Sequence, residues 1–149
     1  MPRPKKQKRK PPPYRMQYGA LPYTIRDGEL LVMLITSRDT GRWIIPKGWP
    51  EKDATPPQLA AREAYEEAGL VGRVAESPLG QYRYEKRLRS GKSVTCFVDV
   101  FPLEVEQELD AWPEKGQRER RWMTSAQAAL LVSEAGLVDL LLTLAAPRA

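Results

Sequence analysis

The sequence contains no histidine among its 149 residues. This absence excludes Ser-His and Cys-His catalysis, histidine proton shuttling and nearly every zinc site. Cys96 is the only cysteine, so an intrachain disulfide is excluded and a reducing, cytoplasmic location is expected. No apolar run reaches the roughly 18–20 residues of a membrane helix, and no apolar segment follows the basic N-terminus as in a secretory signal. Any chemistry must use carboxylates, Lys, Arg, Tyr and a hard metal ion.

Positive charge is concentrated at the N-terminus. Residues 1–17 contain seven Lys or Arg and no acid, so the net charge of +5 leaves −2 for the rest of the chain. Because residues 1–13 are almost entirely Lys, Arg and Pro, we expect a disordered basic tail over 1–17 and one folded domain over 18–149. Such a tail is suited to nucleic acid, to anionic lipid, or to nuclear import in a eukaryote. A solubilising arm without a partner is an equally good reading.

The patterning predicts an α+β fold, in which a mixed sheet lies between helices as an α/β/α sandwich. Asp27-Gly28 separates two β-type runs and predicts a hairpin. Thr55 and Pro56 predict the start of a helix, and Gly69 predicts its end. Its buried face is expected at Ala61, Ala64, Tyr65 and Ala68. Other strands are expected at about 43–45, 72–74, 80–85, 93–103 and 121–123, and helices at 125–132 and 136–144, with irregular structure over 47–55 and 104–117.

Three carboxylates on the predicted helix are the most informative feature. Glu63, Glu66 and Glu67 are spaced i, i+3 and i+4, which places them within roughly a 100° arc of one face. Like charges so close destabilise a helix unless a cation binds them. Oxygen ligands without sulfur or imidazole favour Mg²⁺ or Mn²⁺. Taken alone, however, a Glu-rich turn is more often only a solvated face.

The surrounding residues change that interpretation. Gly48 followed by Arg62-Glu63-Ala64-Tyr65-Glu66-Glu67-Ala68-Gly69-Leu70 resembles the Nudix box, Gly-x5-Glu-x7-Arg-Glu-U-x-Glu-Glu-x-Gly-U, where U is aliphatic. Six of its seven non-aliphatic positions match at the family spacing. The exception is Ala54, which stands where the box has its first Glu. Asp53 and Glu51 lie nearby and are candidate substitutes.

The resemblance implies specific roles for these residues. Glu66 and Glu67 would be the core metal ligands, and Glu63 a ligand or the base. Gly48 would add its carbonyl oxygen, and Arg62 would orient the carboxylates. The family often recruits a further Glu as general base, and Glu114 is the first candidate, with Glu63 second.

Several cations flank the motif. Guanidinium groups match phosphate oxygens in a bidentate way and Lys binds them as a point charge, so we expect phosphate binding by Arg38, Arg42, Lys47, Arg118 and Arg120. Ser37-Arg38, the segment from Arg42 to Gly48, and Arg118-x-Arg120-x-Trp122 resemble the diphosphoinositol polyphosphate phosphohydrolase branch, which also takes diadenosine polyphosphates. The resemblance covers roughly residues 18–144.

The expected function is Mg²⁺- or Mn²⁺-dependent hydrolysis of a phosphoanhydride in a polyphosphorylated small molecule. One alternative is an RNA 5′-pyrophosphohydrolase whose basic tail holds the transcript. Another is a catalytically weakened nucleotide-binding module, suggested by Ala54. The sequence leaves open the oligomeric state, the number of metal ions and the bond that is cut.

Overall fold

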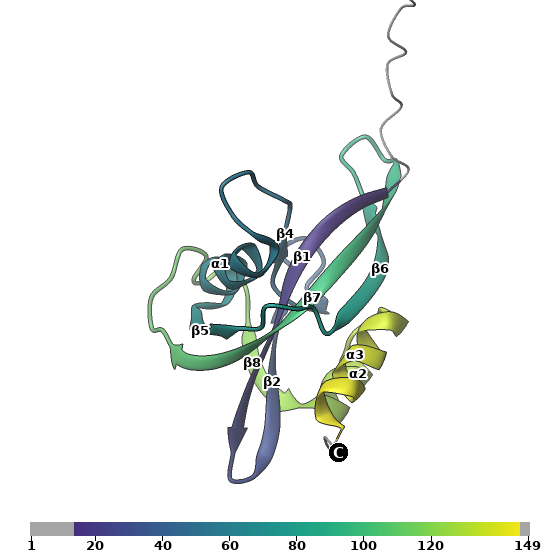
Figure 1. Cartoon of the computed structure of the whole chain (residues 1–149). Helices are drawn as coiled ribbons and strands as arrows, with labels where there is room; N and C mark the ends of the chain where they lie inside the picture. Colours follow the sequence, from purple (N-terminus) through teal and green to yellow (C-terminus); the bar gives the residue numbers. More distant parts are fainter. Residues whose placement is uncertain (1–13, 147–149) are drawn as a thin grey trace, which may run out of the picture.

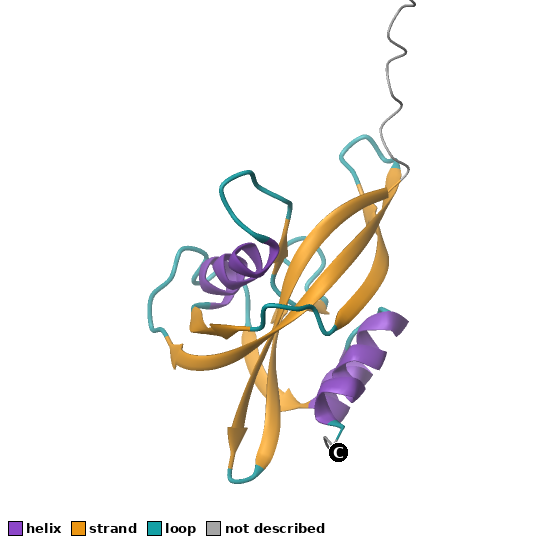
Figure 2. Ribbon diagram, in the orientation of Figure 1, coloured by secondary structure: helices purple, strands orange, loops and turns teal. Residues whose placement is uncertain are grey.

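The computed structural model describes residues 14–146, which form a mixed sheet with helices on both faces (Figure 1, Figure 2). In chain order the elements are β1 (Tyr14–Arg26), β2 (Glu29–Thr36), β3 (Trp43–Ile44), β4 (Lys47–Gly48), α1 (Pro56–Ala68), β5 (Leu70–Val74), β6 (Gly80–Arg87), β7 (Ser93–Glu108), β8 (Arg120–Thr124), α2 (Ser125–Leu131) and α3 (Ala135–Ala145). The predicted α+β class is confirmed.

The sheet is organised around a parallel pair of strands. Strands follow the order β3-β2-β1-β7-β5, while β4 pairs with β1, β6 with β7 and β8 with β2. β1 and β7 are parallel, and each of the other pairs is antiparallel. The predicted hairpin joins β1 to β2, and Asp27 (φ 51°) and Gly28 (φ 78°) both adopt the left-handed conformation that a tight hairpin turn requires.

The largest differences from the predicted strands concern β1, β7 and β4. β1 begins at Tyr14 because the segment from Tyr14 to Tyr23 pairs in parallel with β7, so the predicted tail is wrong for residues 14–17. Residues 1–13 lie outside the described part of the chain. β7 continues to Glu108 beside β5, and β4 forms within a predicted loop by pairing with Tyr18 and Gly19. Each extra strand segment depends on a partner distant in sequence.

The ends of α1 are those the sequence predicts. The Thr55 hydroxyl accepts a hydrogen bond from the Gln58 N–H, and the Gln58 side chain accepts one from the Thr55 N–H, which is a capping box. Gly69 ends the helix with φ 66°. Together the two caps satisfy backbone groups that a helix end otherwise leaves without partners.

The buried face of α1 is displaced from the prediction. Tyr65 is 41% exposed, whereas Leu59 and Ala60 are buried along with Ala64 and Ala68. The helical repeat that faces the sheet therefore starts at Leu59. The small alanines allow the helix to lie close to the strands, and they bring its acidic residues near β4.

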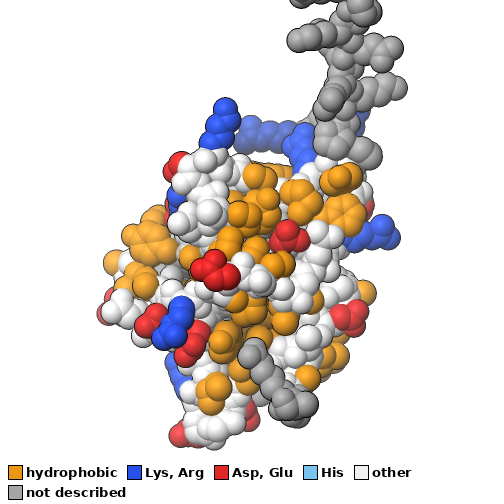
Figure 3. Space-filling view, viewed as in Figure 1, with side chains coloured by type: hydrophobic (Ala, Val, Ile, Leu, Met, Phe, Trp, Pro, Cys, Tyr) orange, Lys and Arg blue, Asp and Glu red, His pale blue; other side chains and the backbone are white. Residues whose placement is uncertain are grey.

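Both faces of the central strands are buried. Val32 and Leu34 of β2 belong to the core under α2 and α3, and the alternate residues Met33 and Ile35 belong to the core under α1. This alternation is what a strand between two helical layers requires. On the face shown in Figure 3, charged side chains of both signs lie singly or in small mixed groups among apolar ones. No helix within residues 14–146 is long and apolar enough to cross a membrane.

Candidate active site

The acidic end of α1 opens onto a cleft of about 310 Å³. Its walls come from the start of β1, the loop after β2, β4 and its following loop, α1, β6 and the segment before β8. The lining residues are Gln17, Ser37, Arg38, Asp39, Ile44, Lys47, Gly48, Trp49, Glu51, Glu63, Glu67, Tyr84, Lys86, Glu114 and Arg118. Of the predicted site residues, Arg38, Lys47, Gly48, Glu63, Glu67, Glu114 and Arg118 are thus brought together.

Two box carboxylates in this cleft share an unusual electrostatic environment. Burial raises the pKa of Glu67 to about 7, although Arg118 and Lys47 oppose the shift. Burial, followed by repulsion from Glu67 and Glu66, raises the pKa of Glu63 to about 7. These shifts mean that the pair resists carrying two negative charges without a compensating cation.

Gly48 brings the backbone of β4 against Glu63. A Cβ atom at residue 48 would lie 2.5 Å from the Glu63 carboxyl carbon, so any other residue here would displace the Glu63 carboxylate from its present position. Glycine thus allows the backbone of β4 to approach this carboxylate closely. The box glycine and the first box carboxylate of α1 are direct neighbours, as the motif resemblance implies.

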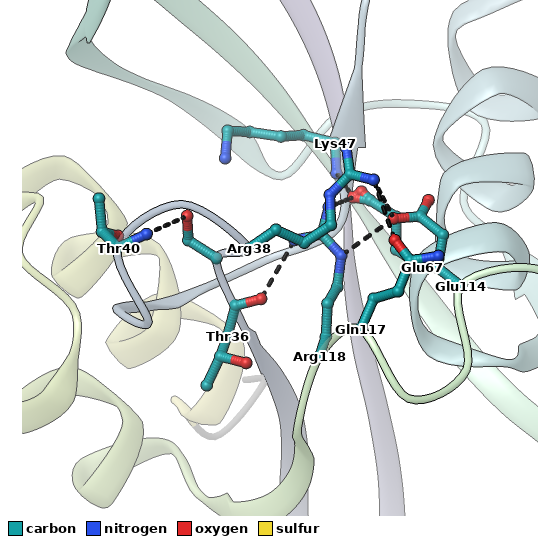
Figure 4. A network of polar contacts seen from close by, with 9 residues as sticks. Thr36, Arg38, Thr40, Lys47, Glu67, Glu114, Gln117 and Arg118 are labelled. Carbon is teal, nitrogen blue, oxygen red and sulfur yellow. Dashed lines mark hydrogen bonds and ion pairs between the residues drawn. The ribbon is translucent and has the colours of Figure 1, made fainter.

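Arg118 and Arg38 converge on Glu114 beside Glu67 (Figure 4). The Arg118 Nε donates to a Glu114 carboxylate oxygen at 3.3 Å, and its Nη2 lies 3.8 Å from Glu67. Arg118 also donates to the Thr36 carbonyl at 3.1 Å. The Arg38 guanidinium lies 3.5 Å from Glu114. These contacts therefore join the loop after β2, helix α1 and the segment before β8 through charged side chains.

Lys47 lies at the base of this arrangement. Its backbone N–H donates to the Glu67 carboxylate at 3.4 Å, and its Nζ lies 5.0 Å from the Tyr84 ring centroid. Burial lowers the pKa of Lys47, and the negative charge of Glu67 opposes that shift. Because desolvation disfavours its charged form, the Lys47 ammonium would be stabilised by an anionic ligand bound in the cleft.

Arg62 is not a lining residue of the cleft, and its guanidinium reaches the loop after β4. It binds Glu51 at 2.9 Å and Asp53 at 3.5 Å. Glu51 and Asp53 are the two acids close to Ala54 in the sequence. They give Arg62 the carboxylate partners that Ala54 cannot provide. The pairs are partly exposed, so they position the loop more than they stabilise the fold.

Two predicted phosphate ligands lie outside the cleft. The Arg120 guanidinium donates to the Ala68 and Leu109 carbonyl oxygens, both at 2.8 Å, and lies 4.0 Å from the Trp112 ring centroid. Arg120 therefore caps the C-terminus of α1. Arg42 is exposed and bonds to Thr40 of its own loop. Neither residue is positioned to bind a ligand beside Glu67.

Glu66 is not a lining residue of the cleft, but its carbonyl oxygen accepts a hydrogen bond from the Glu114 N–H at 3.0 Å. Within residues 14–146, no three Asp, Glu, His or Cys side chains lie close enough to hold a cation as they stand. The crowded Glu63 and Glu67 carboxylates, together with the all-oxygen donor set, nevertheless fit a hard divalent cation. Binding such a cation would relieve the repulsion between them.

Sequence reasoning missed one wall of the cleft. Gln17, Trp49, Tyr84 and Lys86 face the acidic residues. Tyr84 and Lys86 alternate along β6, a pattern that indicates one face of a strand but not what that face meets. For Trp49, the only local indication in the sequence of a place in the cleft is that it directly follows Gly48.

Comparison with known proteins assigns this site to a family. The model of the NUDIX domain matches residues 13–141. The chain belongs to the Nudix family. Nudix proteins generally use divalent metal ions, in agreement with the oxygen-rich cleft.

Individual Nudix relatives differ in their similarity. Nudix hydrolase 13, mitochondrial, from Arabidopsis thaliana is 35% identical over 132 residues, covering 77% of this chain and 65% of that protein. Diphosphoinositol polyphosphate phosphohydrolase 3-alpha from Mus musculus is 33% identical over 99 residues, covering 65% and 56%. The chain thus spans less than two thirds of these relatives. Several plant relatives are named as mitochondrial or chloroplastic, so a cytoplasmic location stays a prediction.

Solved Nudix structures have the same fold. The E. coli dihydroneopterin triphosphate pyrophosphohydrolase has a TM-score of 0.68 at 18% identity, covering 89% of this chain and 97% of that chain. The C. elegans Ap4A hydrolase has a TM-score of 0.64 at 18% identity, covering 88% and 96%. At this level of identity the likeness concerns the fold alone.

The first prediction concerns the cap of α1. Replacing Arg120 by Lys should lower the free energy of unfolding by about 2 kcal/mol, because one ammonium cannot span both carbonyl oxygens. Urea unfolding followed by circular dichroism measures this effect. The matched control, Arg42→Lys, should change stability by no more than about 0.5 kcal/mol. If Arg120→Lys leaves the stability unchanged but weakens the binding of a phosphate-bearing ligand, Arg120 is a ligand-binding residue and not a helix cap.

The second prediction concerns the buried Glu67. Its folded-state pKa of about 7 lies above the ordinary value of 4.5, so the folded state binds the proton more tightly than the unfolded state. In metal-free buffer the free energy of unfolding should fall as pH rises from 4.5 to 7, by on the order of 2 kcal/mol from this residue. Glu67→Gln should flatten this slope in urea titrations across pH. An unchanged slope would contradict the assigned burial.

Proposed function

We propose that this protein is a metal-dependent pyrophosphohydrolase that cleaves a phosphoanhydride in a polyphosphorylated small molecule. The substrate is of the diphosphoinositol polyphosphate or diadenosine polyphosphate type, and the cofactor is Mg²⁺ or Mn²⁺. The observation that carries the proposal is the cleft itself, in which Glu63 and Glu67 face Arg38, Lys47 and Arg118.

The charges in the cleft suit this reaction. A phosphoanhydride carries several negative charges that repel an attacking water, so catalysis needs charge neutralisation, positioning and a base. Glu63, Glu66 and Glu67 would hold a divalent cation, which would supply neutralisation of phosphate charge and activation of a water molecule. Lys47 and Arg118, which lie beside Glu67, would bind the phosphates next to the carboxylates, and Arg38 would join them from the loop after β2.

The carboxylates divide into ligands and a base. Glu66 and Glu67 are assigned as core metal ligands, with the Gly48 carbonyl oxygen. Glu63, with its pKa near 7, suits either a ligand or a general base at neutral pH. Glu114 already accepts from Arg118 and pairs with Arg38. Because both arginines contact the same carboxylate oxygen, Oε1, and so favour the charged form of Glu114 as an ion-pair partner, we place Glu63 ahead of Glu114 as the base.

The relatives support the substrate class. The mouse protein, at 33% identity, is named as a diphosphoinositol polyphosphate phosphohydrolase. Its name describes a small molecule with many phosphates, which agrees with a cleft that holds several cations around an acidic centre. The aligned segment covers only part of each protein, so the substrate itself must be measured.

A weakened binding module is less well supported. That alternative depends on Ala54, whose small side chain would leave Arg62 without a partner. Glu51 and Asp53 instead bind Arg62, so Arg62 of α1 keeps ion pairs with the loop after β4. Saturating Mn²⁺ tests this alternative, since a module would bind nucleotide tightly without turning it over.

The third prediction separates chemistry from folding. Glu67→Gln should reduce turnover by at least about a hundredfold, while circular dichroism and urea unfolding show an intact fold. Glu66→Gln should also reduce turnover strongly if it is a ligand. The matched control is Glu76→Gln, an exposed carboxylate outside the cleft, which should keep parental activity. Parental activity in Glu67→Gln with Mg²⁺ would show that the assignment is wrong.

The fourth prediction concerns substrate choice. An Mg²⁺-dependent screen should show hydrolysis of diphosphoinositol or diadenosine polyphosphates in preference to nucleoside triphosphates and triphosphorylated RNA. A variant lacking residues 1–13 should retain small-molecule turnover. If the full chain prefers RNA and this deletion removes only the RNA activity, with strong dependence on salt, the substrate is RNA instead.

A further inference from the structure

One wall of the cleft contains Trp49 and Lys86, and Arg15 lies at its edge, against the Trp49 ring. Among the described residues, Arg15 and Lys86 take part in none of the salt bridges, whereas Arg38, Arg62 and Arg118 all do. Both groups lie instead over Trp49: the Arg15 Cζ and the Lys86 Nζ are each 5.9 Å from its ring centroid. Two cations therefore approach one indole without any counter-ion.

Strand pairing places these residues on one face. In the parallel pair, Arg15 lies beside Cys96, and Cys96 lies opposite Tyr84 in the antiparallel pair of β6 and β7. Lys86 follows Tyr84 by two residues, so it points to the same side of the sheet. Trp49 comes from the loop after β4 and faces this surface. The wall is thus built by three strands and one loop.

The contacts within the wall do not satisfy its charge. The Tyr84 hydroxyl donates to Gln17, so these two neighbours are engaged with each other. A cation over an exposed aromatic ring gains only about 0.5–1 kcal/mol, and Trp49 is 38% exposed. The attraction to the ring is therefore too weak to replace a counter-ion, and the two cations remain available to an anion.

We propose that Arg15, Lys86 and Trp49 form a second phosphate subsite, which binds a phosphate group of the substrate remote from the anhydride being cut. This inference rests on the proposed function and narrows its substrate class. It favours diphosphoinositol polyphosphates, which carry phosphates around the ring, over diadenosine polyphosphates and nucleoside triphosphates, whose far end is an uncharged nucleoside. Trp49 supports the two cations, and the acidic wall receives the anhydride with its metal ion.

The test is a double variant with a matched control on the same strand. Arg15→Gln with Lys86→Gln removes the two positive charges that lie against Trp49, one from the cleft lining and one from its edge. Arg83→Gln with Arg87→Gln removes the same charge from β6, but these exposed residues occupy the opposite face and do not line the cleft. Comparing the two variants separates a local subsite from a change in net charge.

Binding is measured first, without catalysis. Inositol hexakisphosphate, which contains no anhydride, is titrated into metal-free protein by calorimetry. The Arg15/Lys86 variant should raise Kd by about tenfold or more, and the Arg83/Arg87 variant by less than about threefold. Equal losses in both variants would overturn the proposal. So would a loss in Trp49→Ala without a loss in the cation variant, because that result would indicate ring stacking.

Turnover gives the second readout. The Arg15/Lys86 variant should raise KM for a diphosphoinositol polyphosphate by about tenfold with kcat within about twofold, and should leave the KM for ATP unchanged. An equal rise in both KM values would overturn the subsite. If the parent protein hydrolyses neither compound, the proposed function fails, yet the calorimetric comparison still decides whether the subsite exists.

Discussion

The buried carboxylate of Glu67 is the constraint around which the site is organised. Its side chain is only 5% exposed, and an isolated charge buried so deeply would be very costly. The Lys47 backbone N–H and the Arg118 guanidinium lie beside it, and Arg118 is held in turn by the Thr36 carbonyl. One acidic side chain therefore determines how β4, α1, the end of β2 and the segment before β8 meet.

The ends of α1 add to the stabilisation that its buried alanine face provides. Three neighbouring carboxylates weaken the helix, and its functional face cannot be changed without losing the site. Thr55 and Gln58 cap the first turn, while Gly69 and Arg120 complete the last. Gly69 also lies against Trp112, whose ring would be 2.6 Å from a Cβ atom at that position. The helix is thus held at both termini while its acidic side faces the cleft.

Features with local causes could be predicted from the sequence. The hairpin at Asp27-Gly28 and the boundaries of α1 depend on turn and cap chemistry contained within a few residues, and the box identifies Gly48, Glu63 and Glu67 by spacing. The role of Arg120 could not be predicted this way. Arg118 and Arg120 are two residues apart, yet Arg118 enters the cleft and Arg120 reaches the end of α1. Their different roles depend on where the folded chain places Trp112 and the C-terminal end of α1, and the local sequence does not contain this information.

The wall of Trp49 and Lys86 was missed for a related physical reason. Alternation along β6 indicates that Tyr84 and Lys86 share a face, but the register between β6, β7 and β1 decides that this face meets Gly48 and the acidic helix. In the pair of β1 and β7, that register joins residues about eighty positions apart in sequence, such as Arg15 and Cys96. The box fixes the chemistry through local spacing, whereas substrate choice depends on long-range pairing. Relatives that share the box can therefore differ in substrate without any change in the box itself.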